Sequence, residues 1–523
     1  MLLRFFSKLG LQDLAIIIAL IPMLCLQLQD FAQDPGVGWH LSTGEYINNT
    51  GSIPRIDPFL YSLTPRPWIC DQWLSDLIIF KVFNFGSWPL VYGFFSVVYL
   101  ITYFGFLYPC VAVCTNNRIA SSLVCYLAMR AGLIHFILRP VVFGQLLFCT
   151  LFVCISFFRE RKLSLRTFSI LLPVLFMLWA NLHPSFFMGF ILCSCLVLEG
   201  LYKRVWLSLT NDQLALTVVQ GSFLLLVCFL ATLVNPFGIN LHLSIIELTQ
   251  STFFINYHSE WISLNFKPLQ GRIVQIFLAI ICIAPFFHSN SSNRQSKERH
   301  LDSFSSASLL VFAHLGFEMV RALPHFLTIA SIPVVCSIVT ITNGISDSKL
   351  RILQPLFRFT TWIEQRERKT WYGFPVVVLF SAYILVSALV TKQIPFYSDT
   401  FGPRSESRAV EVIKRLKLEA ERTGKRIVAL ASPDLGGEIT FYGEGKVLAV
   451  IDDRNTLLGE QFYQSYSDKV RIEGKGKAMF EDYAKSLGAN RIILRKDDPI
   501  AIWLTKDGMT GLVTDDKFVV FEL

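Results

Sequence analysis

The side chains best suited to catalysis gather in one loop near the start of the chain. Asp34, His40, Asp57 and Asp71 follow the first long apolar segment, among several Trp and Tyr residues. Ionisable side chains beside a membrane are costly unless a partner or a reaction uses them. A carboxylate that is partly withdrawn from water can take a proton from a hydroxyl or hold a divalent cation. We therefore take these four residues as candidate catalytic residues.

The same loop also has a structural interpretation, and the sequence leaves both open. Asp34 and Asp57 each precede a proline, which is the pattern of a helix N-cap followed by Pro at the first helical position. The residues around His40 and the range 73–80 have the composition of amphipathic helices on a membrane surface. In that interpretation the acids start helices, and the Trp and Tyr rings rest at the interface.

A polytopic helical membrane protein must position this loop. Of the 523 residues, 53% are hydrophobic and 16% are charged, against about 25% charged in an ordinary soluble domain. Apolar runs long enough to cross a bilayer, about 20 residues, recur through most of the chain. We predict eleven spans, near residues 11–30, 88–110, 119–138, 141–158, 167–181, 184–202, 213–234, 271–288, 304–320, 324–343 and 373–392.

Basic residues orient these spans. Lys and Arg occur before the first span and in the loops after the second, fourth, sixth, eighth and tenth. The positive-inside rule makes these loops cytoplasmic, so the N-terminus is inside and the C-terminus outside. Because the net charge of +8 lies in orienting loops, it does not indicate nucleic-acid binding. The cysteines fall mostly in apolar runs and form no C-x-x-C pair, so we predict neither a disulfide framework nor a zinc site.

The outer loops carry candidate substrate-binding residues. Arg139 and Arg321 lie near prolines at outer helix ends, and a guanidinium can hold a phosphate through two hydrogen bonds. The alternatives are contact with lipid headgroups or, for Arg321, pairing with Glu318. Isolated histidines are usually structural, although several on one face favour a site. The other candidates for substrate binding are Asn181, His183, His258, Glu260 and His325.

The composition changes near residue 397. We predict a membrane domain over 1–396, with its first outer loop at 31–87, and a soluble α/β domain over 397–523 on the outer face. Strands alternating with helices indicate a small layered domain. Gly436-Gly437 predicts a turn and fits no phosphate-binding fingerprint. The strands are expected at 426–431, 446–451, 491–494 and 518–521, and the helices at 405–422, 457–466 and 477–487.

These stretches resemble a family of large bacterial inner-membrane proteins. The first-loop string is the most specific part, and the resemblance runs nearly from end to end. Such proteins are similar in layout to the C-type glycosyltransferases, which use polyprenyl-phosphate sugars on the outer side of the membrane. The matching stretches are Asp34-Pro35, Trp39-His40-Leu41, Gly44, Ile53-Pro54, Asp57-Pro58-Phe59, Pro67-Trp68, Trp73-Leu74, Arg139-Pro140, residues 178–183, residues 231–238, Glu260-Trp261, Gly436-Gly437, residues 451–454 and residues 458–460.

The resemblance implies transfer of a sugar, with inversion, from a polyprenyl-phosphate donor to a glycan, lipid or protein acceptor. Asp34 would be the general base or would orient the acceptor, with His40 and His183 near the acceptor. Arg139 and Arg321 would neutralise the donor phosphate. The α/β domain would recognise the acceptor or a partner, outside a bacterial inner membrane.

Two departures from the family pattern remove carboxylates. The family usually has Asp-Pro-Asp where this chain has Asp34-Pro35-Gly36, and His/Asn-Glu-Trp-Leu where it has Asp71-Gln72-Trp73-Leu74. Both argue against a divalent cation held by paired first-loop acids, and we assign no metal ligand and no cofactor. Loss of activity is therefore an alternative, in which the chain is a scaffold for envelope polysaccharide or surface structures. A transporter would need ionisable groups near mid-span and related halves; few such groups and no repeated halves occur.

Overall fold

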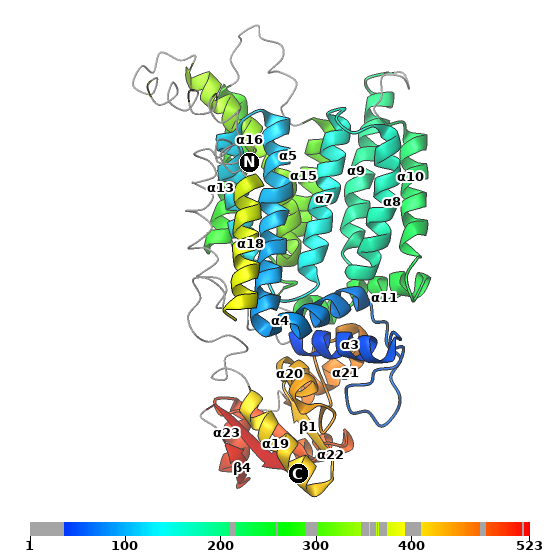
Figure 1. Cartoon of the computed structure of the whole chain (residues 1–523), viewed down its shortest axis with the longest axis vertical. Coiled ribbons are helices and arrows are strands. Elements are labelled where there is room, and N and C mark those ends of the chain that lie inside the picture. The colour runs from blue at the N-terminus through cyan, green and yellow to red at the C-terminus, as the bar shows by residue number, and fades with distance from the viewer. Residues whose placement is uncertain are drawn as a thin grey trace.

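The structure is a computed structural model of the whole chain. It describes residues 36–209, 216–257, 260–287, 302–346, 355, 362, 365, 374–392, 409–470, 477–514 and 517–523. Figure 1 shows a bundle of long helices, two helices that lie across one end of it, and a region of strands and helices beyond them. We call the bundle end that carries these crossing helices the site end.

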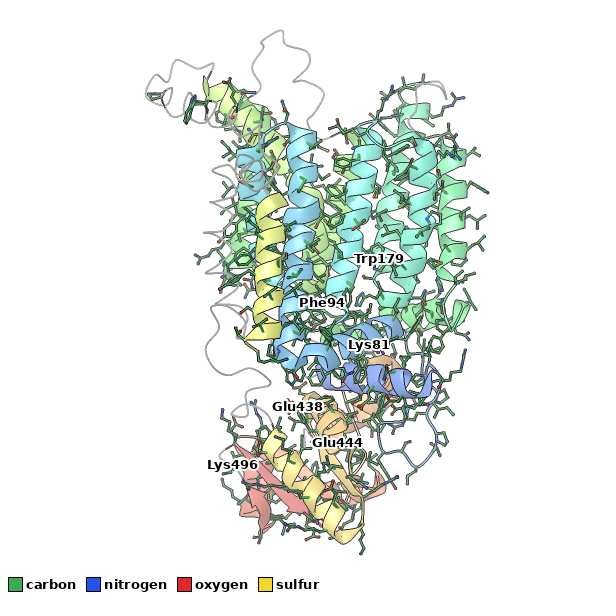
Figure 2. All side chains as sticks on the ribbon, viewed as in Figure 1. Lys81, Phe94, Trp179, Glu438, Glu444 and Lys496 are labelled. Carbon is green, nitrogen blue, oxygen red and sulfur yellow. The ribbon has the colours of Figure 1, made fainter. Side chains whose placement is uncertain are left out.

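Long apolar helices make up most of the bundle. Six helical stretches have the length and composition to cross a membrane. The core between them is aromatic and aliphatic; Trp179, for example, is fully buried within the bundle (Figure 2). The six stretches are Trp73–Thr115, Val141–Arg159 (α7), Leu165–Leu182 (α8), Phe186–Val205 (α9), Leu269–Phe287 and Val320–Ile345.

The other bundle helices are shorter. Their bounds are Arg118–Gly132 (α6), Val218–Thr232 (α10), Ser303–Glu318 (α15) and Phe374–Val390 (α18). Three of the long stretches are composite. The first joins α4 (Trp73–Leu100), a π-helical turn (Ile101–Leu107) and α5 (Tyr108–Thr115), the fifth contains α13 (Leu269–Ile283), and the sixth contains most of α16 (Leu323–Ser346).

These helices make the chain a multi-pass membrane protein, as the composition predicts. The predicted span 11–30 lies outside the described residues. Each of the ten later ranges overlaps a helix of the bundle. Because six stretches meet the length and hydropathy requirements within the described part of the chain, the count of eleven stays a prediction.

The first loop folds into helices, but not as two separate amphipathic pieces. Helix α3 (Val37–Thr50) runs across the site end, while the predicted helix at 73–80 is the start of α4, which continues past a kink at Gly86 and Ser87. The N-cap expected at Asp57 is wrong, because no helix begins there. The Asp57 carboxylate instead accepts hydrogen bonds from the backbone N–H groups of Phe59 and Leu60 within a turn.

Beyond α3 lies a five-stranded sheet with strand order β2-β1-β3-β5-β4. β1 pairs in parallel with β2 and β3, and β5 pairs antiparallel with β3 and β4. The bounds are α19 Val410–Thr423, β1 Ile427–Ala431, α20 Pro433–Gly443, β2 Val447–Ala449, α21 Asn455–Val470, α22 Lys477–Ser486, β3 Arg491–Arg495, α23 Pro499–Lys506, β4 Gly511–Thr514 and β5 Phe518–Glu522. We call this part the C-terminal region.

Sequence patterns missed three elements of this region. Gly436-Gly437 lies inside helix α20 rather than in a turn, and α23 and β4 were not expected. The two glycines serve close packing. A Cβ at Gly436 would overlap the backbone at Ile451, and a Cβ at Gly38 of α3 would overlap the carbonyl of Gly437. Glycine at position 38 lets α3 and α20 approach backbone to backbone, and glycine at position 436 lets α20 approach the chain at Ile451.

Candidate functional site

His40 of α3 and Asp76 of α4 form a buried pair at the site end. His40 Nδ1 lies 2.6 Å from Asp76 Oδ1, and the two side chains are 1% and 0% exposed. Burial, reinforced by the charge of Arg139, holds the pKa of His40 well below its usual range, so the imidazole is neutral. When Nδ1 donates to the carboxylate, Nε2 is left as a proton acceptor.

Two groups just before α4 continue this polar cluster. Burial raises the pKa of Asp71 to about 6, although the Gln72 side chain and the charge of Arg321 act to lower it. Burial also raises the pKa of the Cys70 thiol, whose Sγ lies 3.9 Å from Asp76 Oδ2. A carboxyl group with a pKa near 6 can exchange a proton under ordinary conditions.

Arg321 lies at the same end, within the short 3₁₀ helix η5 (Val320–Ala322) and beside the loop before α13. Its Nη1 lies 3.9 Å from Glu260 Oε2, with the two side chains 35% and 33% exposed. The guanidinium also lies over the ring of Trp261, 5.9 Å from its centroid. Arg321 therefore pairs with Glu260 rather than with Glu318, and the contact is long enough to leave the guanidinium accessible to a ligand.

Three more histidines lie within electrostatic range of Arg321: His135, His183 and His325. His183 is anchored, since its Nδ1 accepts a hydrogen bond from the Ser185 backbone at 3.1 Å and lies 2.8 Å from the Ser185 hydroxyl. His325 differs. The Ala322 backbone lies beside its ring, but neither buried ring nitrogen makes a hydrogen bond of standard geometry within the described chain, and the same holds for Nε2 of His135.

We call these groups the histidine layer: His40, Asp71, Asp76, His135, Arg321 and His325. Buried polar atoms without partners are rare in folded proteins and call for an explanation. Here they are ring nitrogens of His135 and His325, which come from separate elements. A ligand with hydroxyl or phosphate oxygens could meet them.

A second set of charges joins the first loop to the C-terminal region. The guanidinium of Arg454 binds Asp57 at 2.8 Å and Asp452 at 2.7 Å, with all three side chains at most 2% exposed. It also lies over the rings of Trp39, Phe59 and Trp68, 4.6–5.6 Å from their centroids. Arg454 is thus enclosed by two carboxylates and three aromatic rings.

Arg139 takes part in the same contact. Its Nη2 binds Oδ2 of Asp453, and the indole N–H of Trp39 donates to Oδ1 of Asp453 at 2.8 Å. A Cβ added at Gly36 would lie 2.7 Å from the Arg139 guanidinium, so the described chain begins directly beside it. We call Asp57, Arg139, Asp452, Asp453 and Arg454 the docking layer.

Asn181 connects loops rather than facing open space. Its Oδ1 accepts a hydrogen bond from the Trp73 indole at 2.9 Å, and its Nδ2 donates to the carbonyls of Met177 and Val234, both at 2.8 Å. The side-chain amide is therefore occupied by protein partners. Its observable role is to hold α4, α8 and the loop after α10 together.

The structure thus places the candidate residues from the sequence in two groups. It brings His40, Asp71, His183, Arg321 and His325 to one end, with Glu260 beside Arg321. It turns Asp57 and Arg139 toward the C-terminal region. Asp34 and His258 lie outside the described residues.

Sequence reasoning missed Asp76, Asp453 and Arg454. Asp76 could have been noticed as an acid three residues after Trp73 in an otherwise apolar helix start, since a buried acid needs a partner. The Asp452-Asp453-Arg454 run carries no such signal, because charged runs are usually solvated. Among the residues that the structure describes, no group of three or more His, Cys, Asp or Glu side chains could hold a metal ion.

Known structures provide a match for this architecture. The apo oligosaccharyltransferase of Archaeoglobus fulgidus superposes with a TM-score of 0.56 and 9% identity, over 92% of this chain and 69% of that one. The chain has the fold of the C-type glycosyltransferases.

Other solved structures extend the comparison. AglB of the same archaeon, in complex with an inhibitory peptide and a dolichol-phosphate, matches with a TM-score of 0.50 and 9% identity, over 89% of this chain and 66% of that one. The chain therefore spans about two thirds of the length of these archaeal proteins. ArnT from Cupriavidus metallidurans, bound to undecaprenyl phosphate, gives a TM-score of 0.45 at 9% identity, over 97% of both chains. Comparisons with family models and with curated proteins gave no match.

Proposed function

We propose that this chain transfers a sugar from a polyprenyl-phosphate donor to an acceptor at the site end. The observation that carries the proposal is the histidine layer, in which titratable groups from separate elements meet at one end of a C-type bundle. The fold supports it, and the related AglB has been solved with a dolichol-phosphate.

Arg321 is the better candidate for the donor phosphate. Its nearest carboxylate is 3.9 Å away and its side chain is 35% exposed. Arg139 was an equal candidate in the sequence, but its guanidinium binds Asp453 in the docking layer. As the bond between the anomeric carbon and the phosphate oxygen breaks, negative charge develops on the leaving phosphate. A guanidinium placed there stabilises that charge.

His40 joins Asp34 as a candidate for taking the acceptor proton. In an inverting transfer the acceptor oxygen attacks the anomeric carbon while its proton passes to a base. A neutral imidazole held through Nδ1 by Asp76 presents Nε2 for that proton. Asp34 precedes Gly36 by two residues, and Gly36 lies beside Arg139. Asp76 would be a positioning residue, and Asp71 a second proton-exchanging group.

The membrane arrangement belongs to the same proposal. The site end would face the outside of a bacterial inner membrane, with eleven spans and the C-terminal region, over 397–523, on the outer face. Support comes from the opposite end of the bundle. There Arg159 pairs with Glu199 and Asp302 at 2.8 and 2.6 Å, among the basic loops that the positive-inside rule makes cytoplasmic.

Single substitutions in the intact chain test the proposal in cells that depend on the gene. Asp76→Asn, Arg321→Gln and Asp34→Asn should each reduce the transferred glycan at least about 100-fold, with normal amounts of protein in the membrane. Glu45→Gln is the matched control, since Glu45 is an exposed carboxylate on α3. Unchanged glycan profiles in all three variants would remove the catalytic assignment.

One observation favours a second candidate, a non-catalytic scaffold in surface-polysaccharide assembly. Asp57 and Arg139, two of the candidate site residues, are fully engaged in holding the C-terminal region. In a scaffold, variants of the docking layer would abolish function, whereas variants of the histidine layer would not. The same strains, together with one that carries the docking-layer variant Arg454→Met, therefore separate the two functions.

A further inference from the structure

A cavity lined by polar and apolar side chains lies apart from the histidine layer. It has a volume of about 260 Å³ and lies between α11 (Ile239–Gln250) and α12 (Thr252–Tyr257) on one side and α21 on the other. Figure 1 shows α11 at the site end of the bundle and α21 directly beyond it. The cavity therefore opens where the membrane helices meet the C-terminal region.

A break in α21 opens the cavity. Gly459 adopts φ 74° and ψ 163° inside the helix, a conformation that side chains avoid. No atom lies within 4 Å of the place where its Cβ would be. The next residue, Glu460, accepts a hydrogen bond from the Ser251 hydroxyl at 2.7 Å and another from Gln464, also at 2.7 Å. The break is thus fixed against the α11–α12 junction, with a carboxylate oriented at its edge.

The lining has a definite chemical character. The described residues that line it include two carboxylates, Glu247 and Glu460, and two amides, Gln250 and Asn455, together with hydroxyl groups and the apolar side chains of Leu248 and Phe254. None of these described residues is Lys, Arg or His. Such a surface repels phosphate and carboxylate groups. Carboxylate and amide oxygens accept hydrogen bonds from sugar hydroxyls or from an amine.

Asn455 connects this cavity to the first loop. Its buried Oδ1 has no hydrogen-bond partner in the described part of the chain. It also follows Arg454 directly, and Arg454 binds Asp57 of the first loop. A ligand in the cavity therefore lies next to the docking layer, on the α11 side of it.

We propose that this cavity binds a neutral or amine-bearing sugar, which is the acceptor end of the transfer. That the bound sugar is the acceptor rests on the proposed function, whereas its binding in the cavity does not. The donor phosphate is excluded from the cavity by Glu247 and Glu460 and is left to Arg321. The two ligands thus have separate sites of opposite charge.

Direct binding to the purified full-length protein in lipid nanodiscs tests the proposal, using ligand-observed NMR titration. The probes are three trisaccharides of similar size: the glucosamine trimer, its N-acetylated form and trigalacturonate. We expect the first two to bind at least 10-fold more tightly than the acidic one. Glu460→Gln should weaken binding of the amine-bearing trimer at least 10-fold, and Asn455→Ala should weaken both bound trimers.

Glu444→Gln provides the matched control in the same region. Glu444 is an exposed carboxylate that pairs with Lys417, and Figure 2 shows it farther from the bundle than Glu438. Equal binding of all three trimers, or unchanged binding by Glu460→Gln, would overturn the proposal. Binding that disappears on addition of EDTA would also overturn it, because the oxygen ligands would then be holding a hard cation.

Failure of the sugar-binding proposal and failure of the proposed function would give different results. Arg321→Gln should lose sugar transfer but bind the glucosamine trimer as the wild type does. Binding without any transferred glycan in cells would leave the cavity standing and remove the proposed function. Transfer without binding of any neutral or amine-bearing trimer would leave the proposed function standing and remove the cavity proposal.

Discussion

The docking layer and the histidine layer lie at the same end of the bundle but differ in how their polar groups are satisfied. In the docking layer each carboxylate meets a guanidinium, and Arg454 is also enclosed by aromatic rings, although its buried Nη2 has no partner among the described residues. In the histidine layer, His325 and His135 have ring nitrogens without described partners, and Asp71 has a raised pKa. Paired charges hold elements together, whereas unmet hydrogen-bonding capacity is what a ligand can use.

The largest expected effect comes from breaking the docking layer at its centre. Arg454→Met leaves Asp57 and Asp452 buried without their cation, and removing one partner of a buried pair costs about 3–5 kcal/mol. Thermal unfolding in detergent and protease cleavage within 409–523 measure the loss. Lys414→Met is the control, since Lys414 pairs with Glu411 on an exposed face and should cost less than about 1 kcal/mol. Equal effects would mean that Arg454 does not hold the two regions together.

A steric change tests the same layer without touching a charge. Gly38→Ala places a methyl group against the Gly437 carbonyl, so α3 must move away from α20. Overpacking of this kind costs about 1–3 kcal/mol and should loosen the contact between Trp39 and Asp453. Gly51→Asn is the control, because Gly51 has a left-handed backbone with open space around it and Asn tolerates that conformation. Hydrogen exchange at α20 should rise in Gly38→Ala alone.

Much of the membrane framework can be predicted from the sequence, because apolar runs of bilayer length directly require helices. The one-sided gathering of His40, His183 and Arg321 could also be predicted, since span alternation decides which loops share a face. The pairing of Arg139 with Asp453 could not, because those residues are separated by 314 positions and neither has a local signature. The turn predicted at Gly436-Gly437 is wrong for a related reason. A glycine pair indicates a turn unless the helix that packs against it is known.

The stability of the folded chain should depend on pH through Asp71 of the histidine layer. The pKa of Asp71 is raised to about 6 in the folded chain, against about 3.9 when unfolded. The folded state therefore binds more protons between these values, and its stability falls as the pH rises from about 4 to 6. Asp71→Asn removes the titrating group, so wild type and variant should diverge as the pH rises from about 4 to 6. Above pH 6 the variant should be more stable by about 1–2 kcal/mol, a difference discounted for partial exposure. Melting curves from pH 4.5 to 8 measure this difference, and parallel curves would contradict it.

The smallest effect on stability is expected at His325, and there the two layers differ most clearly. Its buried ring nitrogens have no described partner, so His325→Leu removes unmet polar atoms while keeping an apolar contact with Phe148, whose ring centroid is 4.4 Å away. Replacing an unsatisfied polar group by an apolar one is nearly neutral or stabilising, so the free energy of unfolding should change by less than about 1 kcal/mol. His183→Leu is the matched comparison, because it removes the acceptor of the Ser185 N–H and hydroxyl donors, while the hydroxyl oxygen still accepts from the Trp179 indole; it should cost about 1–3 kcal/mol. If His325→Leu leaves stability unchanged but abolishes transfer, its nitrogens serve a ligand. A cost as large as that of His183→Leu would instead assign His325 to the framework.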